Sequence, residues 1–331
     1  MSGLKSFCSK PDHLGRFAVL VRMSFLAVIA GRLLSACVTD PGAVSLPMNA
    51  GIDVTLTPLS SFGAAGTPAM IPGEKSIQLG YAAAIAATGS AIFVVDAAAP
   101  GLVRLDEASG EVRLLYELRD TNTSGLHVSR DMIIQVVDRY NRAVIELDQS
   151  GWERRRFSDR RLIPAPVDVT QTNWGSTILI ADELSHRLAM FDSMSNPTGL
   201  FATTLSPVAA AASIKAVAAT ENFVFVLDGA SGEVIQLDLG GRLFGTHGED
   251  ALLAPVALAV DECQRIFVAD GHSDGLFVTS PEFYGSNTRA SLPPEVTTAV
   301  TDLWVDNNSL YVAAGNLGVY VMAIDPPCMA P

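Results

Sequence analysis

The feature that most constrains the fold is a short motif, a run of apolar residues ending in aspartate, which recurs along the chain. It occurs as FVVD (93–96), QVVD (135–138), LIAD (179–182), FVLD (225–228) and FVAD (267–270), with a degenerate copy, YVAA, at 311–314. Successive copies are 42, 44, 46, 42 and 44 residues apart. A second aspartate follows ten residues later in four copies, at Asp106, Asp148, Asp192 and Asp238. Regular repeats of about this length indicate a propeller or another repeat architecture.

Each repeat contains several short apolar stretches separated by polar turns, which predicts a multistranded blade. Blades stacked around a ring cover one another's apolar faces and protect most strand edges. The sequence therefore predicts an all-β, six-bladed β-propeller over residues 76–331. The expected blades are residues 81–118, 124–157, 165–203, 214–247, 254–286 and 300–325. Because the last blade shows only three strands, we expect residues 52–57 or 75–80 to supply its outer strand and to close the ring.

Residues 76–95 carry no charge, so a transmembrane helix is the alternative interpretation of this stretch. Gly80 and Gly89 interrupt the run, and its second half matches the repeat. Glycine in a helix interior is unfavourable, so the sequence favours strands here.

The first 36 residues are typical of a signal peptide. Basic residues precede a short apolar stretch at 24–31, which is followed by Leu34-Ser35-Ala36-Cys37. The last four residues resemble the lipobox of bacterial lipoproteins. This resemblance implies cleavage before Cys37 and acylation of that cysteine, with fatty acids such as palmitate. An uncleaved signal anchor is the alternative, but the apolar run is short for a membrane span. In lipoproteins, a residue other than aspartate after the cysteine implies the outer membrane, and here it is Val38.

Residues 37–75 are rich in Pro, Gly, Ala, Ser and Thr, which predicts a lipidated, flexible tether between the anchor and the domain. Its one strand-like piece is residues 52–57. Removal of residues 1–36 would leave 17 basic and 34 acidic residues, a net charge of −17. Nucleic-acid binders need a cationic surface, so this charge excludes that class of partner. We expect a bacterial cell-envelope protein whose domain faces the periplasm or the cell surface.

Two segments resemble the NHL-repeat propellers. One is ADELSHRLAMFD at 181–192, and the other is PVALAVD at 255–261, followed by residues 265–270. The resemblance extends over about residues 81–325 and implies a six-bladed ring. NHL propellers serve mainly as protein- or RNA-binding platforms, and a related minority are enzymes. Fold alone therefore does not assign an activity. The resemblance implies that His186, inside the signature turn, has a structural role.

The inner strands carry the candidate chemistry of the channel. Alignment of the blades puts Asp168 and Asp302 at one position, on opposite blades, and His127, Thr170 and Trp304 two residues further on. With His127 and Lys215 nearby, the two carboxylates form a weak candidate for a divalent-metal or acid–base site. Propellers of the gluconolactonase and amidating-lyase type hold their metal on inner strands, but their full ligand set is absent here. The alternative is that these residues only line a water-filled channel. The motif aspartates are expected to cap turns.

Two further features concern the periphery. Five arginines gather in the outer strand and following loop of blade 2, namely Arg154, Arg155, Arg156, Arg160 and Arg161. Such a patch fits an acidic partner or lipid headgroups, although charged edges often serve only to block sheet pairing. Cys263 and Cys328 fall in neighbouring blades, and in an oxidising compartment they are expected to form a disulfide.

The sequence favours a non-enzymatic interaction or scaffold module that binds another envelope or exported protein and needs no cofactor. A metal-dependent hydrolase or lyase acting in the channel is the alternative, and it alone would require a divalent metal. Carbohydrate binding is a weaker third interpretation, because only Trp152, Trp174 and Trp304 offer broad stacking surfaces.

Overall fold

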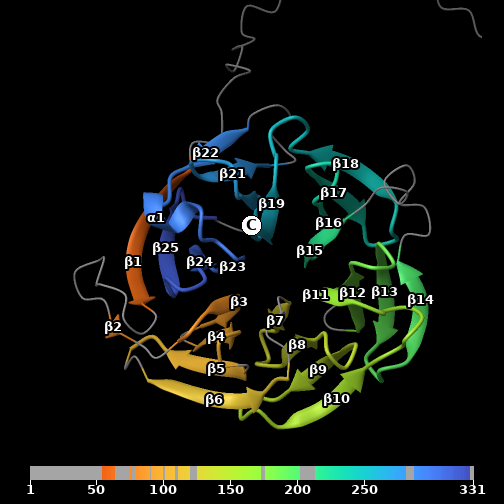
Figure 1. The fold of residues 1–331 in the computed structure, drawn as a ribbon. Coiled ribbons are helices and arrows are strands. Elements are labelled where there is room, and N and C mark those ends of the chain that lie inside the picture. Colours follow the sequence, from red (N-terminus) through yellow and green to blue (C-terminus); the bar gives the residue numbers. More distant parts are fainter. Residues whose placement is uncertain are drawn as a thin grey trace, which may run out of the picture. The chain divides into compact units, whose positions relative to one another are not determined.

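The structure is a computed structural model that describes residues 54–63, 75–76, 79–89, 91–99, 101–108, 111–119, 125–172, 176–201, 213–280 and 287–328. These residues form a ring of six β-sheets, which confirms the predicted six-bladed β-propeller (Figure 1). The predicted signal peptide, Cys37 and most of the predicted tether lie outside the described residues, as does Trp174.

Blades 1 to 3 are four-stranded antiparallel sheets whose strands follow one another from the channel outward. Blade 1 contains β3 (Ala82–Thr88), β4 (Ala91–Asp96), β5 (Gly101–Asp106) and β6 (Val112–Glu117). Blade 2 contains β7 (Leu126–Val128), β8 (Ile134–Asp138), β9 (Ala143–Leu147) and β10 (Glu153–Phe157). Blade 3 contains β11 (Pro166–Thr172), β12 (Thr177–Asp182), β13 (Arg187–Asp192) and β14 (Pro197–Phe201).

Blades 4 and 5 repeat this order, and blade 6 differs in its outer part. Blade 4 contains β15 (Ile214–Ala219), β16 (Phe223–Asp228), β17 (Glu233–Asp238) and β18 (Leu243–His247). Blade 5 contains β19 (Pro255–Val260), β20 (Ile266–Asp270), β21 (Leu276–Thr279) and β22 (Thr288–Ala290). Its outer strand lies beyond the predicted end of this blade at residue 286. Blade 6 contains β23 (Asp302–Asp306), β24 (Ser309–Ala313) and β25 (Val319–Asp325).

The fourth strand beside blade 6 comes from the N-terminal side of the repeats. β1 (Thr55–Gly63) pairs antiparallel with β25, from Thr55 opposite Asp325 to Phe62 opposite Val319. The two-residue strand β2 (Lys75–Ser76) pairs parallel with the end of β1. The strand-like piece expected at 52–57 thus overlaps β1, which extends further along the chain than its sequence pattern indicated.

The second strand of each blade explains why the motif is so apolar. Every residue of β4, β8 and β20 is buried, because these strands are covered by a neighbouring blade on each face. A continuous apolar run bounded by turns is the pattern of such a fully buried strand. Residues 82–88 and 91–96, in the stretch considered as a membrane helix, are strands, and no helix within the described residues is long and apolar enough to span a bilayer.

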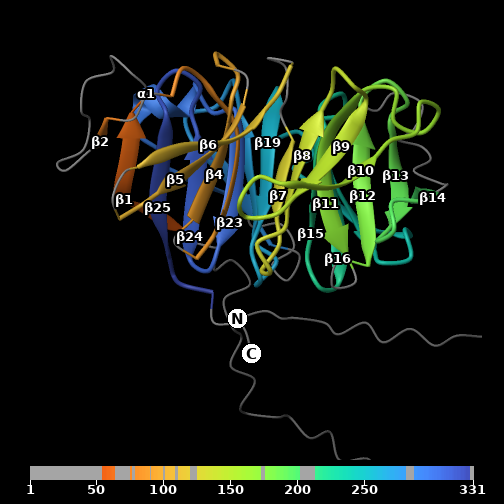
Figure 2. The same ribbon diagram turned by 90° about the horizontal axis from the view of Figure 1, so that it is seen from below.

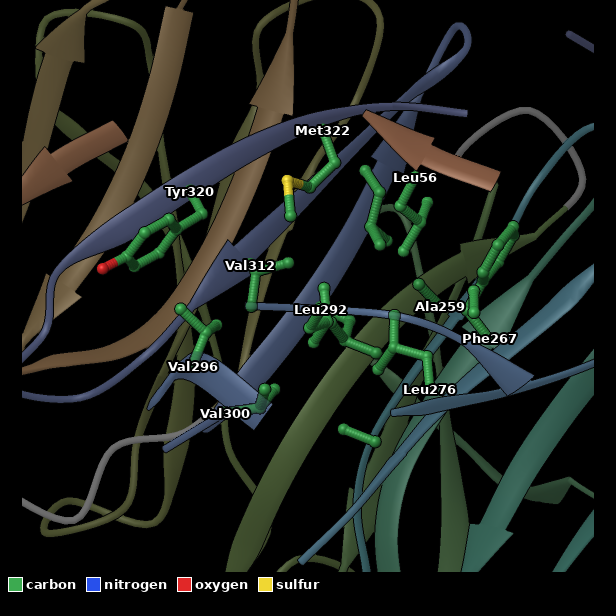
Figure 3. Packing of buried hydrophobic residues seen from close by; sticks show 14 of the residues in the cluster. Leu56, Ala259, Phe267, Leu276, Leu292, Val296, Val300, Val312, Tyr320 and Met322 are labelled. Carbon is green, nitrogen blue, oxygen red and sulfur yellow. The ribbon is translucent and has the colours of Figure 1, made fainter. Parts of the chain in front are cut away.

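Apolar clusters fill the layer between each pair of adjacent blades, which we call a seam. In the seam between blades 5 and 6, Phe267 and Leu276 pack against Val312 and Met322 (Figure 3). The single short helix of the described chain, α1 (Pro294–Thr297), connects these blades and buries Val296 in the same cluster. The core is therefore distributed around the ring rather than gathered at one centre.

The motif aspartates cap turns, as predicted. Asp96 accepts hydrogen bonds from the backbone N–H groups of Gly80, Tyr81 and Ala98 at 2.8–3.0 Å. Asp270 likewise accepts from Leu253 and Ala254, at 2.7 and 3.0 Å. Each carboxylate ties the turn after the second strand to the loop that enters the inner strand. The end of the ring where these aspartates lie is called the motif face below, and the other end is called the far face (Figure 2).

Candidate functional site

The channel is lined by one inner strand from each blade, and the strand pairing fixes which residues share a level. Asp168 pairs with Ala181, and Asp302 pairs with Ala313, so the two occupy equivalent positions. The equivalent positions of blades 1, 4 and 5 hold only alanine, at Ala84, Ala216 and Ala257. β11 and β23 lie on opposite sides of the ring (Figure 1). The structure thus places Asp168 and Asp302 across the channel, as the sequence alignment indicated.

The two carboxylates make the same pair of hydrogen bonds. Asp168 accepts from the backbone N–H of Val169 at 2.8 Å and from that of Val217, in blade 4, at 2.7 Å. Asp302 accepts from Leu303 at 2.8 Å and from Ile85, in blade 1, at 2.9 Å. Each aspartate therefore fastens its blade to the next one. A typical hydrogen bond within a protein contributes about 0.5–1.5 kcal/mol.

Burial changes the protonation of both groups. It raises the pKa of Asp168 to about 7, although the two backbone N–H groups act in the opposite direction. It raises the pKa of Asp302 well above its usual value, and the negative charge of Asp168 raises it further. Two acids coupled in this way titrate as a pair, and the pair keeps its protons to a higher pH than free aspartic acid does.

His127 and Trp304 meet one level further along the channel. Their rings lie 5.3 Å apart in an edge-to-face arrangement. The indole N–H of Trp304 donates to the carbonyl of Ala87 at 2.8 Å, which links blade 6 to blade 1. Burial lowers the pKa of His127 to about 4, so the imidazole is neutral at physiological pH. Such a histidine is poorly suited to deliver a proton at neutral pH.

Lys215, which was predicted to lie near these aspartates, instead contacts a glutamate of the neighbouring blade. Its ammonium nitrogen is 3.2 Å from Oε1 of Glu183, whose other oxygen is 2.6 Å from the guanidinium of Arg139. Residue 139 follows the motif of blade 2, and residue 183 follows that of blade 3. The network therefore connects three blades across the motif face. Inner-strand alignment could not reveal it, because two of its members lie in turns.

At the far face, an ion pair connects turns of two opposite blades. The guanidinium of Arg130, between β7 and β8, contacts the carboxylate of Glu262, between β19 and β20, at 2.5 Å. These turns belong to blades 2 and 5, which are opposite one another in the ring. The contact therefore links two blades that are not neighbours in the ring.

The residues that the structure describes do not bring together three His, Cys, Asp or Glu side chains in a group that could hold a metal ion. Asp168 and Asp302 already use their oxygens to accept backbone N–H groups. The two channel carboxyl groups therefore act as hydrogen-bond acceptors that join neighbouring blades, and their charge depends on pH.

The arginine cluster of blade 2 is divided between the two faces of its sheet. Arg156 lies 3.0 Å from Glu153 and 3.4 Å from Asp138, and Arg155 lies 3.4 Å from the buried Glu146. Arg154, Arg160 and Arg161 are exposed and make no ion pair within 4 Å to any described residue. Only these three remain available for a partner.

The cysteines of blades 5 and 6 are joined. The structure holds a disulfide between Cys263 and Cys328, with their Cα atoms 5.7 Å apart. Nearby, Arg265 donates to the carboxylate of Asp261 and to the carbonyl of Pro326. The C-terminal segment is thus attached to the first turn of blade 5.

The motif face also carries large apolar side chains that the sequence analysis did not single out. Tyr140 is 64% exposed and Leu184 is 68% exposed. Each lies two residues after its motif aspartate, in the turn that connects the second and third strands. Leu253 and Tyr81, at entries to inner strands, are also exposed. Comparing the turns of successive repeats would have revealed the first pair.

Comparison with solved structures shows the fold alone. A Bacteroides thetaiotaomicron protein of unknown function has a TM-score of 0.62 at 13% identity, over 82% of this chain and 76% of that one. A candidate gluconolactonase has a TM-score of 0.57 at 12% identity, over 82% and 98%. Virginiamycin B lyase from Staphylococcus aureus, solved with quinupristin, has a TM-score of 0.56 at 10% identity, over 76% and 83%. No family model and no curated protein matches the sequence.

Proposed function

We propose that this chain is a non-enzymatic interaction module of the cell envelope whose motif face binds another envelope or exported protein. The carrying observation is the exposure of Tyr140 and Leu184 in neighbouring blades of that face. The ion pair between Arg139 and Glu183 joins the two turns that carry these side chains, and exposed apolar side chains that lie close together are typical of an interaction site. Arg160 and Arg161 follow the outer strand of blade 2 and end near the same face, so they would favour an acidic rim on the partner.

The hydrogen bonds of the channel support an interaction role over catalysis. Asp168 and Asp302 each link two blades through backbone N–H groups, and Trp304 adds a second link between blades 6 and 1. Hydrogen bonds between blades keep the ring and its surface rigid. A rigid surface loses little conformational entropy when it binds a partner.

The test is crosslinking in intact cells followed by recovery of the full chain. The wild type is compared with Y140S/L184S, and W152S/M194S serves as the matched control because both of its residues are at least as exposed but lie in far-face turns. We expect a specific crosslinked partner with the wild type and the control, and its loss with Y140S/L184S. Equal recovery with all three forms would overturn the proposed face.

We further propose that the module is an outer-membrane lipoprotein anchored through acylated Cys37, with residues 38–53 as the main part of the tether. The lipobox-like LSAC and Val38 support this placement. The pairing of β1 with β25 supports closure of an NHL-like ring by the N-terminal strand. Metabolic labelling with radioactive palmitate tests the anchor. We expect label in the wild type and none in C37S, and a label retained in C37S would refute the assignment.

A metal-dependent hydrolase or lyase with its site in the channel is the second candidate. The raised pKa values of Asp168 and Asp302 favour it, because perturbed carboxyl groups are common at catalytic sites. Metal analysis of the purified chain distinguishes the two proposals. Stoichiometric divalent metal that disappears in D168A/D302A would establish the second candidate, whereas absence of metal from both forms after incubation with it would remove this candidate.

A further inference from the structure

In the outer part of each seam, one residue of the outer strand lies at a position matched by one residue of the third strand in the next blade. Strand pairing identifies this pair in every seam, and the pair is apolar in some seams and polar in another. In the seam between blades 2 and 3 these residues are Phe157 and Phe191, whose rings pack 5.9 Å apart. In the seam between blades 4 and 5 they are His247 and Thr279.

The remaining seams follow the apolar pattern. The equivalent pairs, from the strand register, are Tyr116 with Leu147, Phe201 with Leu237, Ala290 with Met322, and Phe62 with Leu105. Only the seam between blades 4 and 5 replaces both members with polar side chains. Replacing an apolar pair in a packed interface sacrifices the hydrophobic stabilisation of both side chains, so this exception calls for an explanation.

The structure has a pocket at this exception. It is lined by Thr246, His247, Gly248, Glu249, Thr279, Ser280 and Asn287. Its volume is about 160 Å³. A single water needs only about 10–15 Å³ on this measure, whereas sites for drug-sized ligands begin near roughly 300 Å³. The size therefore fits one small molecular unit, such as a monosaccharide ring.

A buried amide lies behind the wall of the pocket. Gln236 is 1% exposed, and its Oε1 is 2.9 Å from Nε2 of His247. Its Nε2 has no hydrogen-bond partner. In either orientation of the amide one polar atom stays unsatisfied, which costs about 1–3 kcal/mol in a buried position. The residue opposite it on the outer strand is Gly245, where a Cβ would meet nothing nearer than this amide, at 4.0 Å. No side chain of the outer strand therefore satisfies the amide at this position.

The charges around the pocket select among ligands. Burial lowers the pKa of His247, so its imidazole is neutral and its Nδ1 can accept a hydrogen bond. Burial and the neighbouring charges of Glu249 and Asp228 raise the pKa of Glu233, which shows that this part of the blade is electronegative. Anions are therefore disfavoured. Neutral hydroxyl groups suit the site, because they can donate to Glu249 or to His247 and accept from the hydroxyl groups of Thr246 and Thr279.

We infer that the pocket between blades 4 and 5 binds a neutral polyhydroxylated ligand of monosaccharide size. Thr246, His247, Thr279 and Glu249 line it and supply its polar contacts, and the buried amide of Gln236 holds the imidazole of His247. This binding site goes beyond the proposed protein-binding role of the motif face and does not depend on it, since the two involve different blades.

The test measures the reactivity of His247 toward diethylpyrocarbonate in the purified full chain, with peptide mass spectrometry to resolve each histidine. N-acetylglucosamine and glucose, at concentrations up to about 100 mM, are the probes. Tetrahydropyran, which has the ring without the hydroxyl groups, is the control ligand. We expect at least one sugar to slow modification of His247 several-fold, with His272 unaffected and tetrahydropyran without effect.

The variant Q236L provides the second arm. It replaces the amide with an apolar side chain of similar size, so Nε2 of His247 loses its hydrogen-bond partner. We expect the protection of His247 by sugar to fall several-fold. Absence of protection by either sugar, or equal protection by tetrahydropyran, would overturn the inference without recourse to a variant. Y140S/L184S should retain full protection, so failure of the proposed motif-face function and failure of this inference remain distinguishable.

Discussion

The seam between blades 2 and 3 and the seam between blades 4 and 5 occupy equivalent places in the ring but are built from opposite chemistry. The first is filled by Phe157 and Phe191, both fully buried. The second has an apolar cluster in its inner part but His247 and Thr279 at those positions, where a pocket lies. A repeat architecture needs most of its interfaces for stability, because each blade is held by its neighbours. The comparison shows that the outer part of one seam among the six lacks the apolar pair of the others. This part of the seam is therefore available for binding a ligand.

The largest effect is expected from F157A. Removing a fully buried phenylalanine leaves a cavity, and such changes cost about 3–5 kcal/mol. Urea denaturation of the full chain measures the loss in free energy of unfolding. The matched variant H247A should cost less than about 1 kcal/mol, because its seam is already open. Similar losses for both variants would show that the two seams are packed equally well.

The next largest effect on stability is expected from the carboxyl group of Asp168, which joins blades 3 and 4. The pKa of Asp168 in the folded chain is about 7, above the unfolded value of about 3.9. Its protonated form is thus favoured by folding, and the stability gained is present below pH 4 and is lost as the pH rises to 7. We expect D168N to remove this part of the pH dependence, so the difference in unfolding free energy between wild type and D168N should shrink between pH 4 and 7.

That difference is measured by denaturation at each pH. D192N is the control, because Asp192 lies in an exposed turn far from the channel, and hydrogen bonds from Asn196 lower its pKa. A difference between wild type and D168N that stays constant over the whole range would contradict the assignment of the raised pKa to Asp168.

A smaller gain is expected when the hollow seam is converted to the packed one. The double variant H247F/T279L introduces the apolar character found at the other five seams, and we expect it to raise the free energy of unfolding by about 1–2 kcal/mol. Thermal unfolding should show a higher midpoint. A lower midpoint would mean that the polar pair contributes to stability, and it would weaken the argument that this seam is reserved for a ligand.

The smallest effect on stability is expected for Y140S/L184S. Both side chains are more than half exposed, and substitutions at such positions usually change stability by no more than about 0.5 kcal/mol. Urea denaturation checks this value. A cost above about 2 kcal/mol would show that the motif-face residues are structural, and any loss of partner would then report misfolding.

The sequence was sufficient to predict the six-bladed ring, because the apolar motif recurs at regular intervals. The FVVD-type motifs are apolar throughout since both faces of the second strand are buried, and the aspartate marks where that strand ends. The same alignment placed Asp168 opposite Asp302. It did not reveal that Val217 and Ile85 donate to them, because backbone partners in a neighbouring blade leave no trace in residue type.

Features of the turns and seams were harder to predict. Lys215 was misplaced, because a long side chain on an inner strand can extend toward the ring face and there it meets Glu183. The end of blade 5 was placed too early, since β22 is only three residues long and has a weak pattern. The polar pair His247 and Thr279 becomes visible only when strand register reveals which residues of different blades are equivalent.

The ion pair between Arg130 and Glu262 joins blades 2 and 5, which are opposite in the ring and share no seam. Both side chains are more than half exposed, and an exposed pair of this kind adds little to stability and weakens as salt rises. This contact across the diameter therefore cannot replace a broken seam between neighbouring blades.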